Sequence, residues 1–124
     1  MDQQTKDKYS ITFTNRVIDF GIFGKKSRKI LSINNAVVSE FFLDWNNPEE
    51  LDEYLIPDID DVLQGVAIER SNGSETISIS INSNFVVFYV DNVGTDHPQI
   101  PTSDFKEIVE GWRDFLLTPP LNEF

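Results

Sequence analysis

The carboxylates are the residues of this chain whose number and spacing could do chemistry. From Ile30 to Glu69 the sequence has ten of them and no lysine or arginine. Carboxylates at this density can ligate a divalent cation, transfer protons, or attract a positively charged partner. They are Glu40, Asp44, Glu49, Glu50, Asp52, Glu53, Asp58, Asp60, Asp61 and Glu69.

The charges of the chain are unevenly divided along its length. Residues 1–29 have seven basic and three acidic residues, a balance of +4, whereas residues 30–124 have three basic and eighteen acidic residues, a balance of −15. The net charge is −11. A field of this kind repels polyanions and speeds encounter with a basic partner. We therefore expect a cationic partner and no nucleic acid, because phosphates would be repelled.

Metal binding by these acids is not expected. Asp58, Asp60 and Asp61 have the spacing of the start of a calcium loop, but Leu63 stands where an EF-hand loop has its glycine. The chain also has no cysteine and a single histidine, His97, which excludes thiolate and multi-histidine metal sites. We expect no metal and no cofactor.

Catalysis is not expected either. Acid–base catalysis by two carboxylates needs one of them in an apolar pocket, whereas Glu49, Glu50 and Glu53 are predicted to point outward from a helix. Without cysteine, a Cys/His nucleophile is excluded. An enzyme that uses His97 with a neighbouring aspartate, Asp91 or Asp96, is one alternative. We expect a protein that is not an enzyme.

The elements that must position these acids form an α+β domain. We expect an antiparallel sheet of about five to six strands, a C-terminal amphipathic helix, and one or two short helices between strands. Residues 1–8 are expected to be a flexible terminus and residues 9–124 a single domain. Alternating apolar residues and β-branched or aromatic composition predict strands at 9–20, 30–33, 36–45, 66–70, 76–81 and 85–90, with turns at 34–35, 71–74 and 83–84.

The helices are predicted from caps and apolar spacing. Asn47 is a cap before Pro48, and Asp58 is a cap for a second short helix that ends at Gly65. The last helix begins with Ser103 as its cap. Its apolar face consists of Phe105, Ile108, Val109, Trp112, Phe115 and Leu116.

The basic residues near the N-terminus form a cluster after the turn at 21–24. This cluster is expected on the turn, either as a solvated hairpin tip or as a counterweight to the acids. It consists of Lys25, Lys26, Arg28 and Lys29.

The acidic segment can be a solvated surface or a binding surface. A solvated helix face normally mixes charges, and like charges one turn apart cost a few tenths of a kcal/mol per pair. Trp45 beside it is either an interface anchor or a core residue at the end of a strand. If the surface binds a partner, the candidate residues are Asp44, Trp45, Glu49, Glu50, Asp52, Glu53, Asp58, Asp60 and Asp61.

The chain resembles the small acidic immunity proteins of bacterial toxin–immunity systems, including contact-dependent growth inhibition and other polymorphic toxins. The resemblance rests on the size, the one-sided acidity, the strands of the middle region, and the ending from Ile100 to Leu116. That ending leads from a proline loop into a helix with the pattern Trp112-x-x-Phe115-Leu116. No binding residue can be transferred from the family to this chain by position.

The resemblance implies a non-enzymatic protein that binds a cognate toxin and covers its active site or substrate groove. The toxin would be cationic, as a nuclease is. Two alternatives are a nucleic-acid mimic that blocks a DNA-binding protein, and an acidic scaffold domain. The apolar runs are too short to span a bilayer and no secretory signal is visible, so we expect no membrane partner and a cytoplasmic location. Dimerisation stays open, because edge strands can pair.

Overall fold

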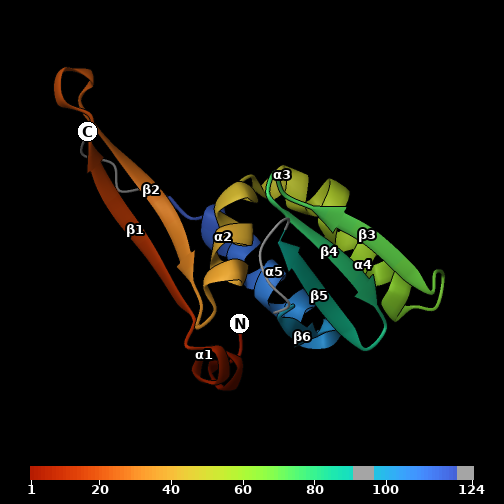
Figure 1. Cartoon of the computed structure of the whole chain (residues 1–124). Coiled ribbons are helices and arrows are strands. Elements are labelled where there is room, and N and C mark those ends of the chain that lie inside the picture. Colours follow the sequence, from red (N-terminus) through yellow and green to blue (C-terminus); the bar gives the residue numbers. More distant parts are fainter. Residues whose placement is uncertain (91–96, 120–124) are drawn as a thin grey trace.

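The computed structural model describes residues 1–90 and 97–119, and it has an α+β fold (Figure 1). The expected class and the antiparallel pairing of the strands are confirmed, but the described strands form two sheets and not one. The smaller sheet is a hairpin of β1 (Thr12–Asp19) and β2 (Lys25–Ser32). The larger sheet has the order β3 (Glu69–Gly73), β4 (Ile77–Asn82), β5 (Phe85–Val90) and β6 (Gln99–Pro101).

Helices cover one face of the larger sheet and form the core with it (Figure 1). In β4 the isoleucines alternate with serines, so that Ile77, Ile79 and Ile81 are buried. Aromatic rings from three elements meet on this face, since the ring of Phe41 lies 5.5 Å from that of Phe88 and 6.1 Å from that of Phe105. The helical segments are α1 (Gln3–Tyr9), η1 (Gly21–Phe23), α2 (Ala36–Asp44), α3 (Pro48–Glu50), η2 (Leu51–Leu55), α4 (Ile56–Leu63) and α5 (Thr102–Leu116).

The prediction of a strand at 36–45 was wrong, because this segment is helix α2. The side chain of Asn35 caps it and accepts hydrogen bonds from the backbone N–H groups of Val37 and Val38, at 3.0 and 3.3 Å. Val38, Phe41 and Phe42 are buried at three- and four-residue spacing. The β-branched and aromatic composition favours a strand locally, but packing of this helical stripe on the core decides the outcome.

The N-terminus also differs from the prediction. Residues expected to be flexible form α1, whose cap is Asp2. The hydroxyl of Tyr9 at its end donates to a carboxylate oxygen of Asp104 at 2.6 Å, and Lys8 donates to the same oxygen at 3.1 Å. These bonds attach α1 to the beginning of α5.

The acidic segment from Pro48 to Leu63 is a single helical run and not two short helices. Asn47 caps it as predicted. Pro57 has no N–H to donate, and the helix accommodates it with the wider π turn η2, in which the N–H of Ile56 bonds to the carbonyl of Leu51. Asp58 is therefore not a cap, since it lies inside the first turn of α4.

The connections in the second half are partly as predicted. The turn at 83–84 is confirmed, and Asn82 stabilises it by accepting bonds from the N–H groups of Asn84 and Phe85. The β3–β4 turn lies at 74–76 instead of 71–74, because β3 extends to Gly73. Strand β6 was missed, and α5 begins at Thr102 without a side-chain cap from Ser103.

The β1–β2 hairpin projects from the body of the domain (Figure 1), and we name it the arm. Its turn lies at 20–24, as expected, with Gly24 at a φ of 86°. The basic cluster lies on β2 and not on the turn. In the antiparallel register Lys25 faces Asp19, and Arg28 faces Arg16.

Candidate functional site

The helical run from Pro48 to Leu63 has one apolar and one acidic side. Leu51, Leu55 and Ile59 are fully buried against the core. The carboxylates lie on the remaining circumference, as predicted from the alternation of apolar and acidic residues. The structure separates them into two groups, which differ in whether a cation from elsewhere in the chain reaches them.

The first group of acids is neutralised within the molecule. Arg113 of α5 contacts Asp52 at 2.9 Å, and Lys106 of the same helix contacts Asp60 at 2.7 Å. A third cation is Arg70 of β3, which lies 3.3 Å from Asp61 and 4.0 Å from Asp58. These are the only lysines and arginines between residues 30 and 124 of the sequence. The fold thus brings to the acidic helix the cations that its own segment lacks.

These ion pairs hold the acidic helix to its neighbours. A hydrogen bond to Asp60 raises the pKa of Lys106, and a hydrogen bond to Asp52 raises the pKa of Arg113. Asp58 also accepts a bond from the side-chain amide of Asn72 at 3.0 Å, which ties α4 to β3. We therefore assign Asp52, Asp58, Asp60 and Asp61 to the fold, although the sequence predicted all four as partner-binding residues.

The second group has no such neutralisation. Within residues 1–90 and 97–119, Asp44, Glu49, Glu50 and Glu53 are exposed and take part in no ion pair. We name these four carboxylates the acidic surface. They extend from the end of α2 to the middle of the helical run.

Helix stability explains the presence of only two of the four carboxylates of the acidic surface. Glu49 and Glu50 lie in the first helical turn, where a negative charge is favourable. Asp44 lies in the last turn of α2, which has no basic residue, so its charge opposes the helix dipole. Glu53 follows Glu49 by one turn, a like-charged pair that costs a few tenths of a kcal/mol. Asp44 and Glu53 are thus the two carboxylates without a structural reason.

Trp45 is a core residue, so the alternative of an exposed interface anchor is wrong. Its side chain is only 8% exposed. The indole N–H donates to the carbonyl of Gly73 at 3.2 Å, and the carbonyl of Trp45 accepts from the indole of Trp112 at 2.6 Å. Two exposed apolar side chains that the sequence reasoning did not single out are Tyr54, beside Glu53, and Leu43, beside Asp44; they are 59% and 39% exposed.

The arm is a second charged surface, of opposite sign. Arg16, Lys25, Lys26 and Arg28 are exposed on it, and in the described part of the chain none of them makes an ion pair. Arg16 and Arg28 face each other across the strands, an arrangement that destabilises a hairpin. Sequence reasoning found Lys25, Lys26 and Arg28, but it did not single out Arg16 or predict their position on a projecting ribbon.

The tip of the arm is apolar. Ile22 is 95% exposed and Phe23 is 79% exposed, and Phe20 is 48% exposed. Asp19 at the base of the tip accepts a bond from the N–H of Gly21 at 2.8 Å, which fixes the turn. The arm therefore presents large apolar side chains at its end with cations directly behind them.

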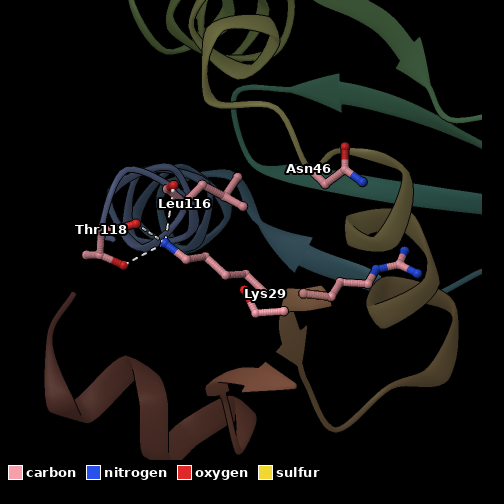
Figure 2. A pocket seen from close by; sticks show the side chains of 6 residues that line it. Lys29, Asn46, Leu116 and Thr118 are labelled. Atoms are coloured by element: carbon pink, nitrogen blue, oxygen red, sulfur yellow. Dashed lines mark hydrogen bonds between the residues drawn. The ribbon is translucent and has the colours of Figure 1, made fainter. Parts of the chain in front are cut away.

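Lys29 has a different role from the other cations of its cluster. Its ammonium donates to the carbonyl oxygen of Phe115 at 2.8 Å. It also donates to the carbonyl oxygens of Leu116, at 3.4 Å, and Thr118, at the C-terminal end of α5 (Figure 2). Burial lowers the pKa of Lys29. It lines an open cleft of about 450 Å³ where the arm meets the body, together with Ser27, Arg28, Asn46, Leu116 and Thr118. This cleft lies at the junction between the arm and the body, and Lys29 in it is hydrogen-bonded to the end of α5.

The structure brings no catalytic or metal-binding group together in the residues that it describes. His97 is exposed, and its ring lies 4.7 Å from that of Tyr89. Asp91 and Asp96, the predicted alternatives for its partner, lie outside the described residues. Within residues 1–90 and 97–119 there is no group of three or more histidine, cysteine or acidic side chains with metal-binding geometry. Nor does any helix of that part have the length and apolar character needed to cross a membrane.

Comparison with known proteins finds no relative: no family model, no curated protein and no solved structure matches the chain.

Proposed function

We propose that this protein is an immunity protein, which binds a cognate cationic bacterial toxin and neutralises it. The toxin would be a basic nuclease, and the acidic surface would cover its active site or substrate groove. The single observation that supports this proposal is the acidic surface itself. Every lysine and arginine between residues 30 and 124 pairs with an acid of the first group, and within the described part of the chain these four carboxylates form no ion pair.

The arrangement supports association with a basic surface in two ways. Lysines and arginines that bind the phosphates of a nucleic acid can pair with carboxylates instead. The charge of −11 also steers a cationic partner toward the protein before contact. The interface that we propose is smaller than the sequence predicted, because four of the predicted carboxylates are engaged within the fold and Trp45 is buried.

The first test is the partner itself. We expect the neighbouring reading frame to encode a large secreted protein with a variable basic C-terminal domain. That domain, produced separately, should bind this protein and lose its toxicity when the two are co-expressed. Association should slow sharply as ionic strength rises, as stopped-flow fluorescence can measure. An association rate that does not change with ionic strength would contradict the electrostatic part of the proposal.

Charge reversal tests the surface. Glu53→Lys should weaken binding and protection, because Glu53 lies beyond the first helical turn and its reversal leaves the helix start unchanged. Reversal of Glu49 and Glu50 in addition should weaken both further. Glu75→Lys is the matched control, since Glu75 is exposed in the β3–β4 turn. Equal protection by the Glu53 and Glu75 variants would move the interface elsewhere.

Catalysis can be separated from binding with one substitution. The proposed mechanism needs no reaction at His97. A His97→Ala variant should therefore protect cells as well as the natural protein does. Loss of protection by this variant, with binding retained, would favour an enzyme instead.

A further inference from the structure

The arm has cations that form no ion pair with the rest of the described chain. In a chain with twenty-one acids, Arg16, Lys25 and Arg28 have no recorded partner among the described residues, and Lys26 has only the ring of Phe20, 6.0 Å away. The other basic residues all contact an acid, a ring or a helix end. Those contacts belong to Lys6, Lys8, Lys29, Arg70, Lys106 and Arg113.

The arm is also unfavourable as it stands alone. Two arginines face each other on it, and Ile22 and Phe23 are almost fully in water at its end. An isolated two-stranded hairpin is marginally stable at best. A partner that covers the outer half of the arm would relieve both the charge repulsion and the apolar exposure.

We propose that the arm binds a second copy of this chain, and that two copies exchange arms reciprocally to form a dimer. The outer arm of one copy lies on the acidic surface of the other. The four cations of the arm, which also has one acid, Asp19, then meet four carboxylates that form no ion pair within the described residues of their own copy. Tyr54 and Leu43 adjoin those carboxylates and provide exposed apolar surface for the tip.

Charge complementarity favours a second copy over a polyanion. The chain has both halves of the contact, and within residues 1–90 and 97–119 neither half makes an ion pair. A nucleic acid would have to approach a protein of net charge −11 through only four outer cations. The two like-charged bodies can still associate, because the arm holds them apart. Its eight strand residues span about 26 Å, and charges in water are screened over a Debye length of about 8 Å at physiological salt.

The dimer forms without the toxin. It uses the same carboxylates as the proposed function, so arm exchange and toxin binding would compete for them. The test of the dimer needs only the purified protein. Failure of the dimer proposal can therefore be distinguished from failure of the toxin proposal. Substitutions in the arm test the dimer and leave the acidic surface unchanged.

The first measurement is the molar mass of the purified full chain by sedimentation velocity over a concentration series. We expect the mass of two chains at high concentration, and dissociation as sodium chloride is raised. A protein that stays monomeric at every concentration would overturn the inference. So would a mass above two chains, because it would show open-ended association instead of reciprocal exchange.

Two charge-reversed variants make the test specific. The arm variant is Arg16→Glu with Arg28→Glu, which keeps a like-charged pair across the strands and so matches the stability of the natural hairpin. The surface variant is Asp44→Lys with Glu53→Lys, which avoids the first helical turn. Each alone should raise the dissociation constant by about tenfold or more. Mixed together they should form a one-to-one heterodimer, because the reversed arm then lies on the reversed surface and the natural arm on the natural surface.

The mixture decides between a specific contact and general charge effects. Net charge becomes more negative in the arm variant and less negative in the surface variant, so a general charge effect would weaken the first homodimer and strengthen the second, whereas a specific contact predicts that both are weakened. Absence of rescue, or a natural protein that binds anionic vesicles or duplex DNA through the arm while remaining monomeric, would overturn the proposal.

Discussion

Replacement of Lys29 by methionine tests how the arm is attached to the body. Methionine keeps most of the apolar stem and removes the ammonium. The change removes the ammonium from the carbonyl oxygens of Phe115, Leu116 and Thr118, of which that of Phe115 still accepts from the N–H and hydroxyl of Thr118. It also removes a cation from the negative end of the helix dipole.

The magnitude follows from these two losses. A partly buried cation at a helix C-terminus contributes up to about 2 kcal/mol, and carbonyls near the surface recover part of their bonding from water. We therefore expect the free energy of unfolding to fall by about 1–2 kcal/mol. For a chain of this size this corresponds to a decrease in Tm of roughly 3–10 °C.

The assay is urea unfolding at pH 7 followed by tryptophan fluorescence, because both indoles are buried in the core. Lys25→Met is the control, since Lys25 is on the same strand, exposed and without a recorded contact. It should change stability by less than about 0.5 kcal/mol. Equal effects of the two substitutions would refute the reasoning that Lys29 caps α5.

Three further substitutions test other contacts. Burial raises the pKa of Asp104, but hydrogen bonds from the tyrosine and lysine of α1 lower it by more, so the pKa is depressed overall. Asp104→Asn should therefore lower the free energy of unfolding by about 1–2 kcal/mol at pH 7, and this loss should vanish as pH falls through the depressed pKa. Urea unfolding at pH 7 and at a pH below that pKa measures the difference. Gly73→Ala should destabilise by about 1–3 kcal/mol in the same assay, because its Cβ would lie 2.8 Å from the carbonyl oxygen of Ile77. Trp112→Phe should cost about 2–4 kcal/mol and lower Tm, since it removes buried volume and the donor to the carbonyl of Trp45.

The sequence predicted those elements whose local and global signals agree. Phe105, Ile108, Val109 and Trp112 repeat at helical spacing, and they are buried in α5 as expected. The cap at Asn47 was also recognised, because its amide oxygen acts within three residues of the chain.

The errors occurred where composition and packing disagree. Val37, Val38 and Phe41 favour a strand by residue type, yet their helical spacing and the cap at Asn35 make α2. The strands form two separate sheets because of how the arm packs on the body, and local sequence patterns do not predict this packing. Strand β6 is short, at Gln99–Pro101, and exists by pairing with β5.

The candidate site could be predicted only as a list of acids. Asp60 and Asp61 belong to the same acidic segment as Glu49 and Glu53, and the sequence offers no sign that separates them. The separation comes from cations far along the chain that the fold brings back to the helix. A long-range contact of this kind has no short-range pattern, so local reasoning placed the ion-paired and the unpaired acids in one candidate set.

The attachment of both ends of α5 has a consequence for synthesis of the chain. Tyr9 contacts its start across 95 residues of sequence, and Lys29 contacts its end across 86 to 89 residues. Because α5 comes after both of them in the chain, neither α1 nor the arm can dock on it until α5 has left the ribosome. During translation the apolar side of β1 and β2 stays without its partner helix until then. We expect these two attachments to form late in folding, because contacts of such long sequence separation form slowly.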